Sequence, residues 1–435
     1  MIFWRVKSLD AILATAEKKS LHRSLSVWQL TLLGVGAIIG TGIFVLTAEA
    51  AQKAGPGMML SFVIAGFVCA VAALCYSELS SMVPVSGSAY TYSYAVMGEL
   101  VAWLVGWALM LEYSVAASAV AVGWSGYFVG LLQNSLGIEM PFALANGPFA
   151  GGIINLPAVI ICMLVVGLLV IGTRESATFN AVLVAVKIAA LMLFIALTMP
   201  VAEWSNFQPF LPLGEAGVVA AASSIFFAYV GFDAVSTAAE ETKNPQRNVP
   251  IGLIGSLGIC TIFYLLVSAG AIGAVGAQPV MDADGNGLIP GSRLLADQCQ
   301  SLITAGQQPL VCSREALALV LREIGWEKIS NLLGLAAFLA LPSVVLMMLF
   351  GQTRIFFVMS RDGLLPEVLS RIHPRFKTPH VVTYVTGLGV TIAAAFFPVG
   401  KLADISNSGT LFAFMVVAFA VMILRIKDKS RVRPF

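Results

Sequence analysis

The fold is decided by the apolar stretch Leu30-Thr-Leu-Leu-Gly-Val-Gly-Ala-Ile-Ile-Gly-Thr-Gly-Ile-Phe-Val45, which lies inside a hydrophobic run from about 27 to 51. Gly34, Gly36, Gly40 and Gly42 fall within nine residues, and each costs about 1 kcal/mol of helix stability relative to alanine. We therefore expect the helix to be interrupted near Gly40. In hydrocarbon, interrupted backbone must be buried in protein or line a cavity. The alternative is a glycine face for close helix packing, for which Gly36 and Gly40 are correctly spaced.

A second stretch, Ser224-Ile-Phe-Phe-Ala-Tyr-Val-Gly-Phe-Asp-Ala234, lies in the middle of the apolar run from about 215 to 239. Gly231, followed two residues later by Asp233, is a poor continuation of a membrane helix. Two interrupted spans in corresponding parts of a chain are typical of the binding sites of secondary transporters. The pair therefore favours interruption over simple packing and predicts one site between the two stretches.

The composition excludes a soluble globular protein. The chain is 58% hydrophobic and only 11% charged, with a mean hydropathy of +0.90, whereas soluble domains carry about 25% charged residues. We expect an all-α polytopic membrane protein. Ten apolar runs are long enough to cross the ~30 Å hydrocarbon core, at about 27–52, 58–83, 95–132, 153–172, 177–200, 215–240, 250–277, 329–359, 380–398 and 402–425.

Interruptions in the first and sixth of ten spans predict a 5+5 inverted repeat, because an odd number of helices makes the second half enter from the opposite side. In chain order, the predicted parts are an amphipathic N-terminal segment 1–26, a first repeat 27–200, a second repeat 215–425 and a tail 426–435. Of 25 basic residues, 18 fall on the side of both termini and six on the other side. The positive-inside rule therefore predicts that both termini lie in the cytoplasm. The expected location is the plasma (inner) membrane.

The loop 278–328 is the one sizeable hydrophilic piece on the opposite, outer side. It contains Cys299 and Cys312 in a compartment that permits a disulfide, and the sequence leaves their pairing open. Asp282 begins half of a calcium-loop pattern, but Arg293 stands where the bidentate glutamate belongs. We therefore expect a plain turn there and no metal site.

The two interrupted helices would present opposite backbone charges to the membrane centre. The amides of Gly40, Thr41 and Gly42 would lie unpaired at the positive end of a half-helix, which attracts a carboxylate. The carbonyls from Phe226 to Val230 would lie at a negative end, which attracts an ammonium group. An α-amino acid carries both groups at a fixed separation, so the sequence predicts an L-amino acid as the substrate.

Charged residues inside the spans are the other candidates for function. Lys187 lies about ten residues from either end of its span, where an ammonium must be paired or neutral. It could therefore exchange a proton as the cavity opens to either side, or it could be a static charge that holds exposed carbonyls. Glu112 and Asp233 could complement a cationic side chain, relay protons or satisfy free amides. Tyr229 and Phe232, together with Phe227, could gate the site or simply pack.

Enzymatic functions have little support. The Gly34-Val-Gly36 pattern lacks the dinucleotide spacing and lies in a membrane helix, there is no phosphate-binding loop, and the three histidines form no metal constellation. No basic stripe with interleaved aromatic residues indicates nucleic acid. We therefore expect no enzyme activity, no cofactor and no nucleic-acid partner, and the oligomeric state stays unknown.

Five motifs resemble the cationic amino acid transporter branch of the amino acid-polyamine-organocation superfamily. They are Gly36-Ala-Ile-Ile-Gly-Thr-Gly-Ile-Phe-Val45, Gly87-Ser-Ala-Tyr-Thr-Tyr-Ser-Tyr94, Phe227-Ala-Tyr-Val-Gly-Phe-Asp233, Glu240-Glu-Thr-Lys-Asn-Pro245 and Ser360-Arg-Asp-Gly-Leu-Leu365. The resemblance implies the five-plus-five fold, with the substrate carboxylate at Thr41 and Gly42.

For the substrate amine, the resemblance implies the carbonyls of Ile38, Phe227, Ala228 and Val230. It also implies that Lys187 takes the place of a sodium ion, and that Leu341 and Pro342 face the side-chain pocket. The expected function is proton-coupled uptake of cationic or neutral L-amino acids. An amino acid exchanger and a non-transporting sensor are the alternatives, and two interrupted helices suit an occluded site better than a channel.

Overall fold

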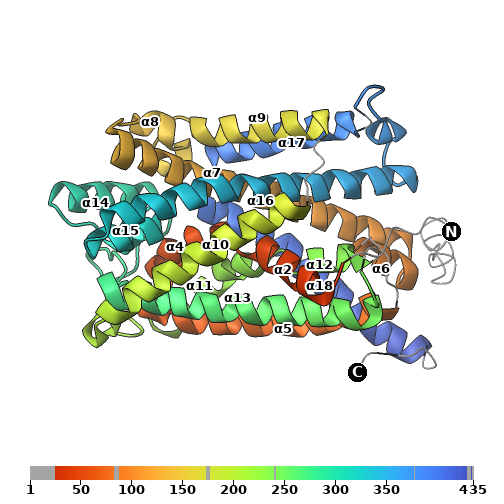
Figure 1. The fold of residues 1–435 in the computed structure, drawn as a ribbon, viewed down its shortest axis with the longest axis horizontal. Coiled ribbons are helices and arrows are strands. Elements are labelled where there is room, and N and C mark those ends of the chain that lie inside the picture. Colours follow the sequence, from red (N-terminus) through yellow and green to blue (C-terminus); the bar gives the residue numbers. More distant parts are fainter. Residues whose placement is uncertain are drawn as a thin grey trace.

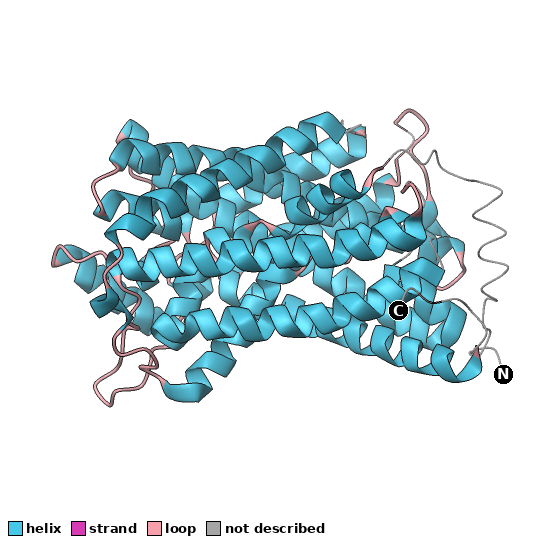
Figure 2. Ribbon diagram, turned by 60° about the horizontal axis from the view of Figure 1, so that its bottom comes forward, coloured by secondary structure: helices cyan, strands magenta, loops and turns pink. Residues whose placement is uncertain are grey.

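The structure, a computed structural model, describes residues 25–82, 88–172, 177–239, 242–376, 378–428 and 433. Its helices run along the long axis of the molecule (Figure 1), and loops gather at the two ends (Figure 2). Among the described residues, six helices are long and apolar enough to cross a membrane, four shorter apolar helices accompany them, and no strand is formed. The predicted all-helical membrane class is confirmed, while the count of ten spans and the repeat stay predictions.

The α-helices alternate along the chain with short 3-10 helices. Up to residue 200 the α-helices are α2 (Val27–Ile38), α3 (Thr41–Phe44), α4 (Leu46–Ala54), α5 (Met58–Met82), α6 (Ser88–Val96), α7 (Glu99–Leu136), α8 (Phe142–Ala145), α9 (Leu156–Ile171) and α10 (Ala177–Thr198). Beyond it they are α11 (Gly214–Ile225), α12 (Ala234–Thr237), α13 (Pro245–Val275), α14 (Arg293–Thr304), α15 (Ala316–Glu323), α16 (Glu327–Arg361), α17 (His380–Phe396) and α18 (Val399–Lys427). The short 3-10 helices are η1 (Gly55–Gly57), η2 (Pro148–Ala150), η3 (Met199–Val201), η4 (Trp204–Phe207), η5 (Phe226–Tyr229), η7 (Leu310–Cys312) and η8 (Glu367–Ser370).

Both predicted interruptions are present. α2 begins at a capping box in which the Ser26 hydroxyl accepts from the Gln29 amide, and it ends at Ile38. Gly40 is extended, with φ −150° and ψ −145°, before α3 begins at the next residue. In the second stretch α11 tightens into η5, and the chain then turns at Gly231 with φ +112°, a conformation that residues with a Cβ rarely adopt.

The interrupted segments lie in the centre of the bundle. α5 and α13 pack side by side along one edge, and α9 and α17 along the opposite edge (Figure 1). Between these edges α7 packs against α16 and α18, and α2 packs against α10 and α13. Long helices therefore surround the short segments α3, η5 and α12, and the buried core is continuous across the molecule.

The loop between α13 and α16 is folded onto one end of the bundle, at the left of Figure 1. Cys299 and Cys312 form a disulfide, so the pairing that the sequence left open is present. The Asp282 carboxylate accepts from the amides of Asp284 and Asn286, at 3.0 and 2.8 Å. The backbone hydrogen bond from Asn286 holds the pKa of Asp282 below its usual value. This is the plain turn that the sequence predicted.

Several sequence predictions concern residues that the structure does not describe. Residues 1–24 of the predicted amphipathic segment and residues 429–432 and 434–435 of the predicted tail lie outside the described residues, as do Gly87, Glu240 and Glu241 of the quoted motifs. The described part of the motif that begins at Gly87 lies in α6, and the Tyr90 hydroxyl donates to Asp362 at 3.0 Å. α6 is thereby joined to the residue that follows α16.

Candidate functional site

The two interrupted stretches touch each other at two places. A Cβ atom added to Gly42 would collide with the backbone of Ala228, and one added to Gly231 would lie 3.0 Å from the carbonyl oxygen of Ala37. Both positions therefore need glycine for the main chains to approach this closely. The whole of 34–48 and of 224–233 is buried, so the predicted site is brought together and is closed to solvent in this structure.

The first interruption leaves main-chain donors free. The amides of Gly40, Thr41 and Gly42 donate to no acceptor among the described residues, whereas the Val45 amide donates to the Thr41 carbonyl at 2.9 Å. The Thr41 hydroxyl is buried and also has no hydrogen-bond partner in the described part of the chain. Thr41 packs against α7 at Gly123, where an added Cβ would lie 2.6 Å from its methyl carbon. These unpaired donors are the group that the sequence predicted for a carboxylate.

The expectation of bare carbonyls is wrong at three of the four predicted acceptors. The Tyr264 hydroxyl of α13 lies 2.9 Å from the carbonyl oxygen of Ile38 and 2.7 Å from that of Ala228. The Phe227 carbonyl accepts from the Val230 amide at 3.2 Å. A carbonyl oxygen has two lone pairs, and one hydroxyl donates only one proton. The carbonyls therefore keep the capacity to accept from an ammonium group, and their predicted role is unchanged.

Tyr264 itself was missed by the sequence reasoning. It is fully buried, and its ring packs edge-on against Tyr229, with centroids 5.3 Å apart. The feature of the sequence that could have indicated it is a tyrosine inside an apolar span, because a buried tyrosine hydroxyl needs a hydrogen-bond partner. In this structure the interruptions supply that partner, because its hydroxyl lies between two carbonyls that they expose.

Lys187 lies against the first interruption. Its Nζ atom donates to the Gly36 carbonyl at 3.2 Å, and the side chain is 2% exposed. A Cβ added to Gly36 would collide with Val184, one turn earlier on α10. Because α2 ends at Ile38, the Gly36 carbonyl is one of the last carbonyls of the helix, where the dipole favours a cation. The position is compatible with both roles that the sequence left open.

α16 covers Gly40 with an apolar side chain. An added Cβ at Gly40 would lie 3.7 Å from both methyl groups of Val344. Leu341, the predicted pocket residue, is fully buried one turn away on the same helix, and residues three apart share a helix face. Pro342 instead lines a groove on the surface of α16. Val344 is therefore a pocket candidate that the sequence reasoning did not name, and Pro342 is not on the pocket side.

The predicted gate residues Tyr229 and Phe232 both face α5. The Tyr229 hydroxyl donates to the Phe62 carbonyl at 2.9 Å. The Phe232 ring packs against Tyr76 of α5 and Phe414 of α18, with centroids 6.0 and 5.1 Å apart. In this structure both side chains pack in the core, and a gating role stays a prediction.

Glu112 and Asp233 lie near each other on the α18 side of the second interruption. Both side chains are buried. Neither carboxyl oxygen of Glu112 has a hydrogen-bond partner among the described residues, while Asp233 accepts from the Tyr113 hydroxyl at 3.3 Å. The Ser406 hydroxyl of α18 donates to the Glu112 carbonyl at 3.1 Å. These acids form a polar cluster separate from Lys187.

A second polar cluster, which the sequence reasoning missed, joins α4, α11 and α18. Lys53 lies 3.1 Å from Glu49 and 3.4 Å from Asp404. It also donates to Ser224, whose hydroxyl donates to Asp404 at 2.6 Å. Since α4 follows the first interruption and Ser224 precedes the second, this cluster holds the two half-helices together on one side of the site.

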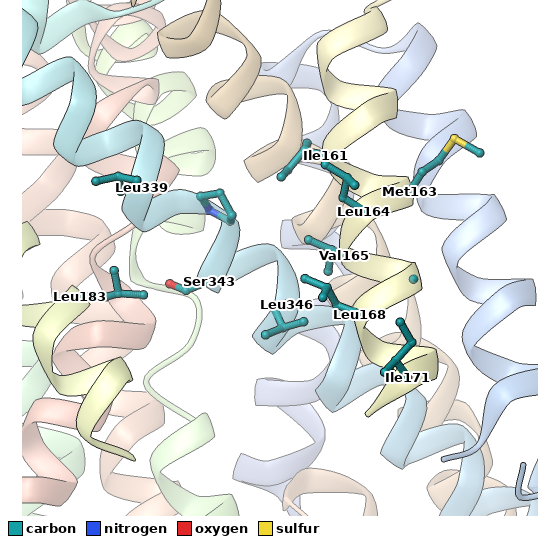
Figure 3. A pocket seen from close by; sticks show the side chains of 12 residues that line it. Ile161, Met163, Leu164, Val165, Leu168, Ile171, Leu183, Leu339, Ser343 and Leu346 are labelled. Carbon is teal, nitrogen blue, oxygen red and sulfur yellow. The ribbon is translucent and has the colours of Figure 1, made fainter. Parts of the chain in front are cut away.

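One surface groove lies away from the two interruptions. It has a volume of about 550 Å³ and is lined by side chains of α9, α10 and α16, which are almost all apolar (Figure 3). Within the part of the chain that the structure describes, no group of His, Cys, Asp and Glu side chains could hold a metal ion.

Comparison of the chain with known proteins identifies its family. The model of the amino acid permease family matches residues 25–435. The chain is 45% identical to the branched-chain amino acid permease BcaP of Bacillus subtilis over 99% of this chain and 87% of that protein. It is 42% identical to the methylthioribose transporter of the same organism, over 98% and 86%. It is 32% identical to human cationic amino acid transporter 4, over 94% and 61%. The chain belongs to the amino acid permease family.

Proposed function

We propose that the chain is a secondary active transporter that takes up L-amino acids together with protons. The observation that carries the proposal is the contact between the two interrupted helices at Gly42 and Ala228. It places unpaired amide donors on one side and helix-end carbonyls on the other, within one buried volume. A zwitterion satisfies both at once, whereas a ligand with a single charge leaves one set of dipoles unsatisfied.

The carboxylate is held by the amides of Gly40, Thr41 and Gly42, and the Thr41 hydroxyl supplies a further donor. The ammonium group accepts no hydrogen bonds and has three donors, so it donates to up to three of the four carbonyls of Ile38, Phe227, Ala228 and Val230. Tyr264 fixes two of these carbonyls relative to each other. The side chain of the substrate then points toward α16.

The apolar surface of α16 favours a neutral, apolar substrate side chain. Val344 covers Gly40, and Leu341 is buried on the same face. This fits the name of the branched-chain relative. A cationic substrate is the second candidate, since the buried acids Glu112 and Asp233 lie on the α18 side of the same interruption.

Proton coupling rests on Lys187. In its protonated form the ammonium stabilises the carbonyl end of α2 through Gly36, and loss of the proton removes the charge and weakens that interaction. Transport then follows alternating access, with five-helix repeats at 27–200 and 215–425 related by inversion, and with Tyr229, Phe232 and Glu112 lining or gating the pocket. Both termini lie in the cytoplasm, because 18 of the 25 basic residues fall on that side.

The experiment is uptake of labelled leucine into proteoliposomes with an imposed pH gradient, acid outside. Leucine, alanine and arginine are offered as competitors. The proposal expects accumulation that depends on the gradient and competition in the order leucine, alanine, arginine. Accumulation that ignores the gradient but requires an amino acid inside indicates an exchanger. Binding without any uptake or counterflow indicates a sensor.

A further inference from the structure

A second surface groove, of about 520 Å³, lies between α7 and α16. α7 lines it from Phe128 to Leu136, and α16 lines it from Lys328 to Phe338. We name it the α7–α16 groove. The two helices run in opposite directions along it, since the rings of Phe128 and Phe338 stack with centroids 5.9 Å apart and the end of α7 lies by the start of α16.

The side chains of the α7–α16 groove are ordered by polarity along its length. Ser135, Lys328 and Asn331, the polar residues of the lining, all lie toward the end where α7 finishes and α16 begins. The remaining side chains are leucine and phenylalanine. Leu335 is 44% exposed and therefore presents its apolar surface to the surroundings. The groove is thus polar and cationic at one end and apolar along the rest.

The length of the groove matches one leaflet of a bilayer. Lys328 and Phe338 are ten residues apart on one helix, which is about 15 Å at 1.5 Å per residue. The hydrocarbon core is ~30 Å thick. Both α7 and α16 are long and apolar enough to cross a membrane, and the polar end of the groove lies at their ends. The polar end therefore falls at the membrane interface and the stacked aromatic rings fall near the midplane.

We propose that the α7–α16 groove binds one phospholipid molecule. The ammonium group of Lys328 and the side-chain amide of Asn331 bind its phosphate, to which the N-terminal end of α16 adds a favourable dipole. One acyl chain fills the apolar part down to Phe338. The gradient of polarity, the charge and the length of the groove each fit this ligand, whereas a second protein helix needs no cation at the interface end.

The bound acyl chain ends on residues that support the candidate site. Phe338 stacks on Trp124, with centroids 5.3 Å apart. The Trp124 indole N–H donates to the Phe338 carbonyl at 2.9 Å, which Pro342 leaves without its helical donor. Gly123, next to Trp124 in α7, packs on Thr41. A lipid in the groove therefore stabilises the contact between Phe338 and Trp124, and the residue next to Trp124 contacts Thr41.

The groove of Figure 3 is the natural control. It is of similar volume and also lies on α16, but its lining has no charged residue, and the hydroxyl of Ser343 is already bonded to the Ala340 carbonyl at 2.7 Å. Lipid tails cover such a surface without recognition of a headgroup. Leu339 lines that groove and is 54% exposed, so it is matched to Leu335 of the α7–α16 groove.

The test measures phosphatidylglycerol bound to the delipidated full chain in detergent, by native mass spectrometry. The variants are Lys328→Gln, which removes the cation, and Leu335→Trp, which fills the groove. Their controls are Lys401→Gln, another exposed lysine, and Leu339→Trp. We expect one phosphatidylglycerol per chain in the wild type and in both controls, at least fivefold weaker binding in both test variants, and weak binding of diacylglycerol, which lacks the phosphate.

Three results would overturn the proposal. The first is equal binding of phosphatidylglycerol by the wild type and by Lys328→Gln or Leu335→Trp. The second is binding of diacylglycerol as tight as that of phosphatidylglycerol, because the phosphate then contributes nothing. The third is a dimer that Leu335→Trp separates, since a second copy is then the occupant. The melting temperature of each variant checks that it is folded, and the two test variants act by unrelated changes, so one suffices if the other fails to fold.

Discussion

The Nζ atom of Lys187 lies 3.2 Å from the carbonyl oxygen of Gly36, at the point where the first membrane helix stops. A continuous helix would use this carbonyl for its own hydrogen bond to residue 40. Because the helix is interrupted, the Gly36 carbonyl has no helical donor among the described residues, and it accepts a hydrogen bond from Lys187 instead. The same break that exposes donors for a substrate carboxylate therefore also creates the hydrogen-bond partner of this buried lysine.

Substitutions of Lys187 distinguish its two possible roles, which are exchange of a coupled proton and a fixed charge that holds exposed carbonyls. Lys187→Met removes the ammonium group, and Lys187→Arg keeps a cation that does not release its proton. We expect leucine uptake by both variants to lose its response to an acid-outside gradient. Uptake is measured in proteoliposomes with and without the gradient, next to Lys401→Met as a control. If Lys187→Arg responds like the wild type, the lysine is a fixed charge and proton coupling must lie elsewhere.

Removing the Tyr264 hydroxyl weakens the alignment of the two interruptions. Tyr264→Phe keeps the ring but loses the bonds to Ile38 and Ala228. A hydrogen bond contributes about 1 kcal/mol net, so we expect leucine affinity to fall by about fivefold, measured by equilibrium binding. Tyr90→Phe, whose hydroxyl bonds to Asp362, should leave the affinity unchanged. Tighter binding by Tyr264→Phe would mean that the hydroxyl competes with the substrate.

Gly42 must remain glycine for the two stretches to touch. In Gly42→Ala the new methyl group collides with the main chain of Ala228. Overpacking of this kind costs ~1–3 kcal/mol, so leucine affinity should fall by about fivefold or more. Gly258→Ala is the control, because nothing lies within 4 Å of its added Cβ. Wild-type affinity in Gly42→Ala would show that this contact is not part of the site.

The contribution of the cluster around Lys53 to stability should depend on the balance between its positive and negative charges, and not on the number of its contacts. Lys53→Met leaves Glu49 and Asp404 without their cation. A fully buried pair broken in this way costs ~3–5 kcal/mol, and partial exposure of Asp404 reduces the loss to about 2 kcal/mol. We expect a lower melting temperature and slower uptake. Adding Glu49→Gln and Asp404→Asn to Lys53→Met should restore part of the stability, and no recovery would contradict the electrostatic explanation.

The sequence predicts the interruptions well because their cause is local. Gly40 and Gly231 weaken a helix wherever they stand, and Asp233 is costly in hydrocarbon whatever its neighbours are. The free amides at Gly40 to Gly42 follow directly from the end of α2. These parts of the site depend on main-chain geometry, which a single stretch of sequence specifies.

The partners of the interruptions depend on tertiary packing and could not be predicted in the same way. Tyr264 lies more than two hundred residues from Ile38 and reaches its carbonyl only after α13 packs on α2. Asp404 joins Lys53 across an even longer separation. The sequence likewise placed Pro342 at the pocket, whereas the helix phase turns Val344 toward Gly40 and Pro342 toward the surface.

The most direct test of the central claim is equilibrium binding of three ligands that share one side chain: leucine, leucine amide without the carboxylate, and 4-methylpentanoate without the amine. If the interrupted helices bind both charged groups through Gly40–Gly42 and through the carbonyls near Ala228, only leucine binds, and each analogue is weaker by at least a hundredfold. Binding of either analogue as tightly as leucine would contradict the account.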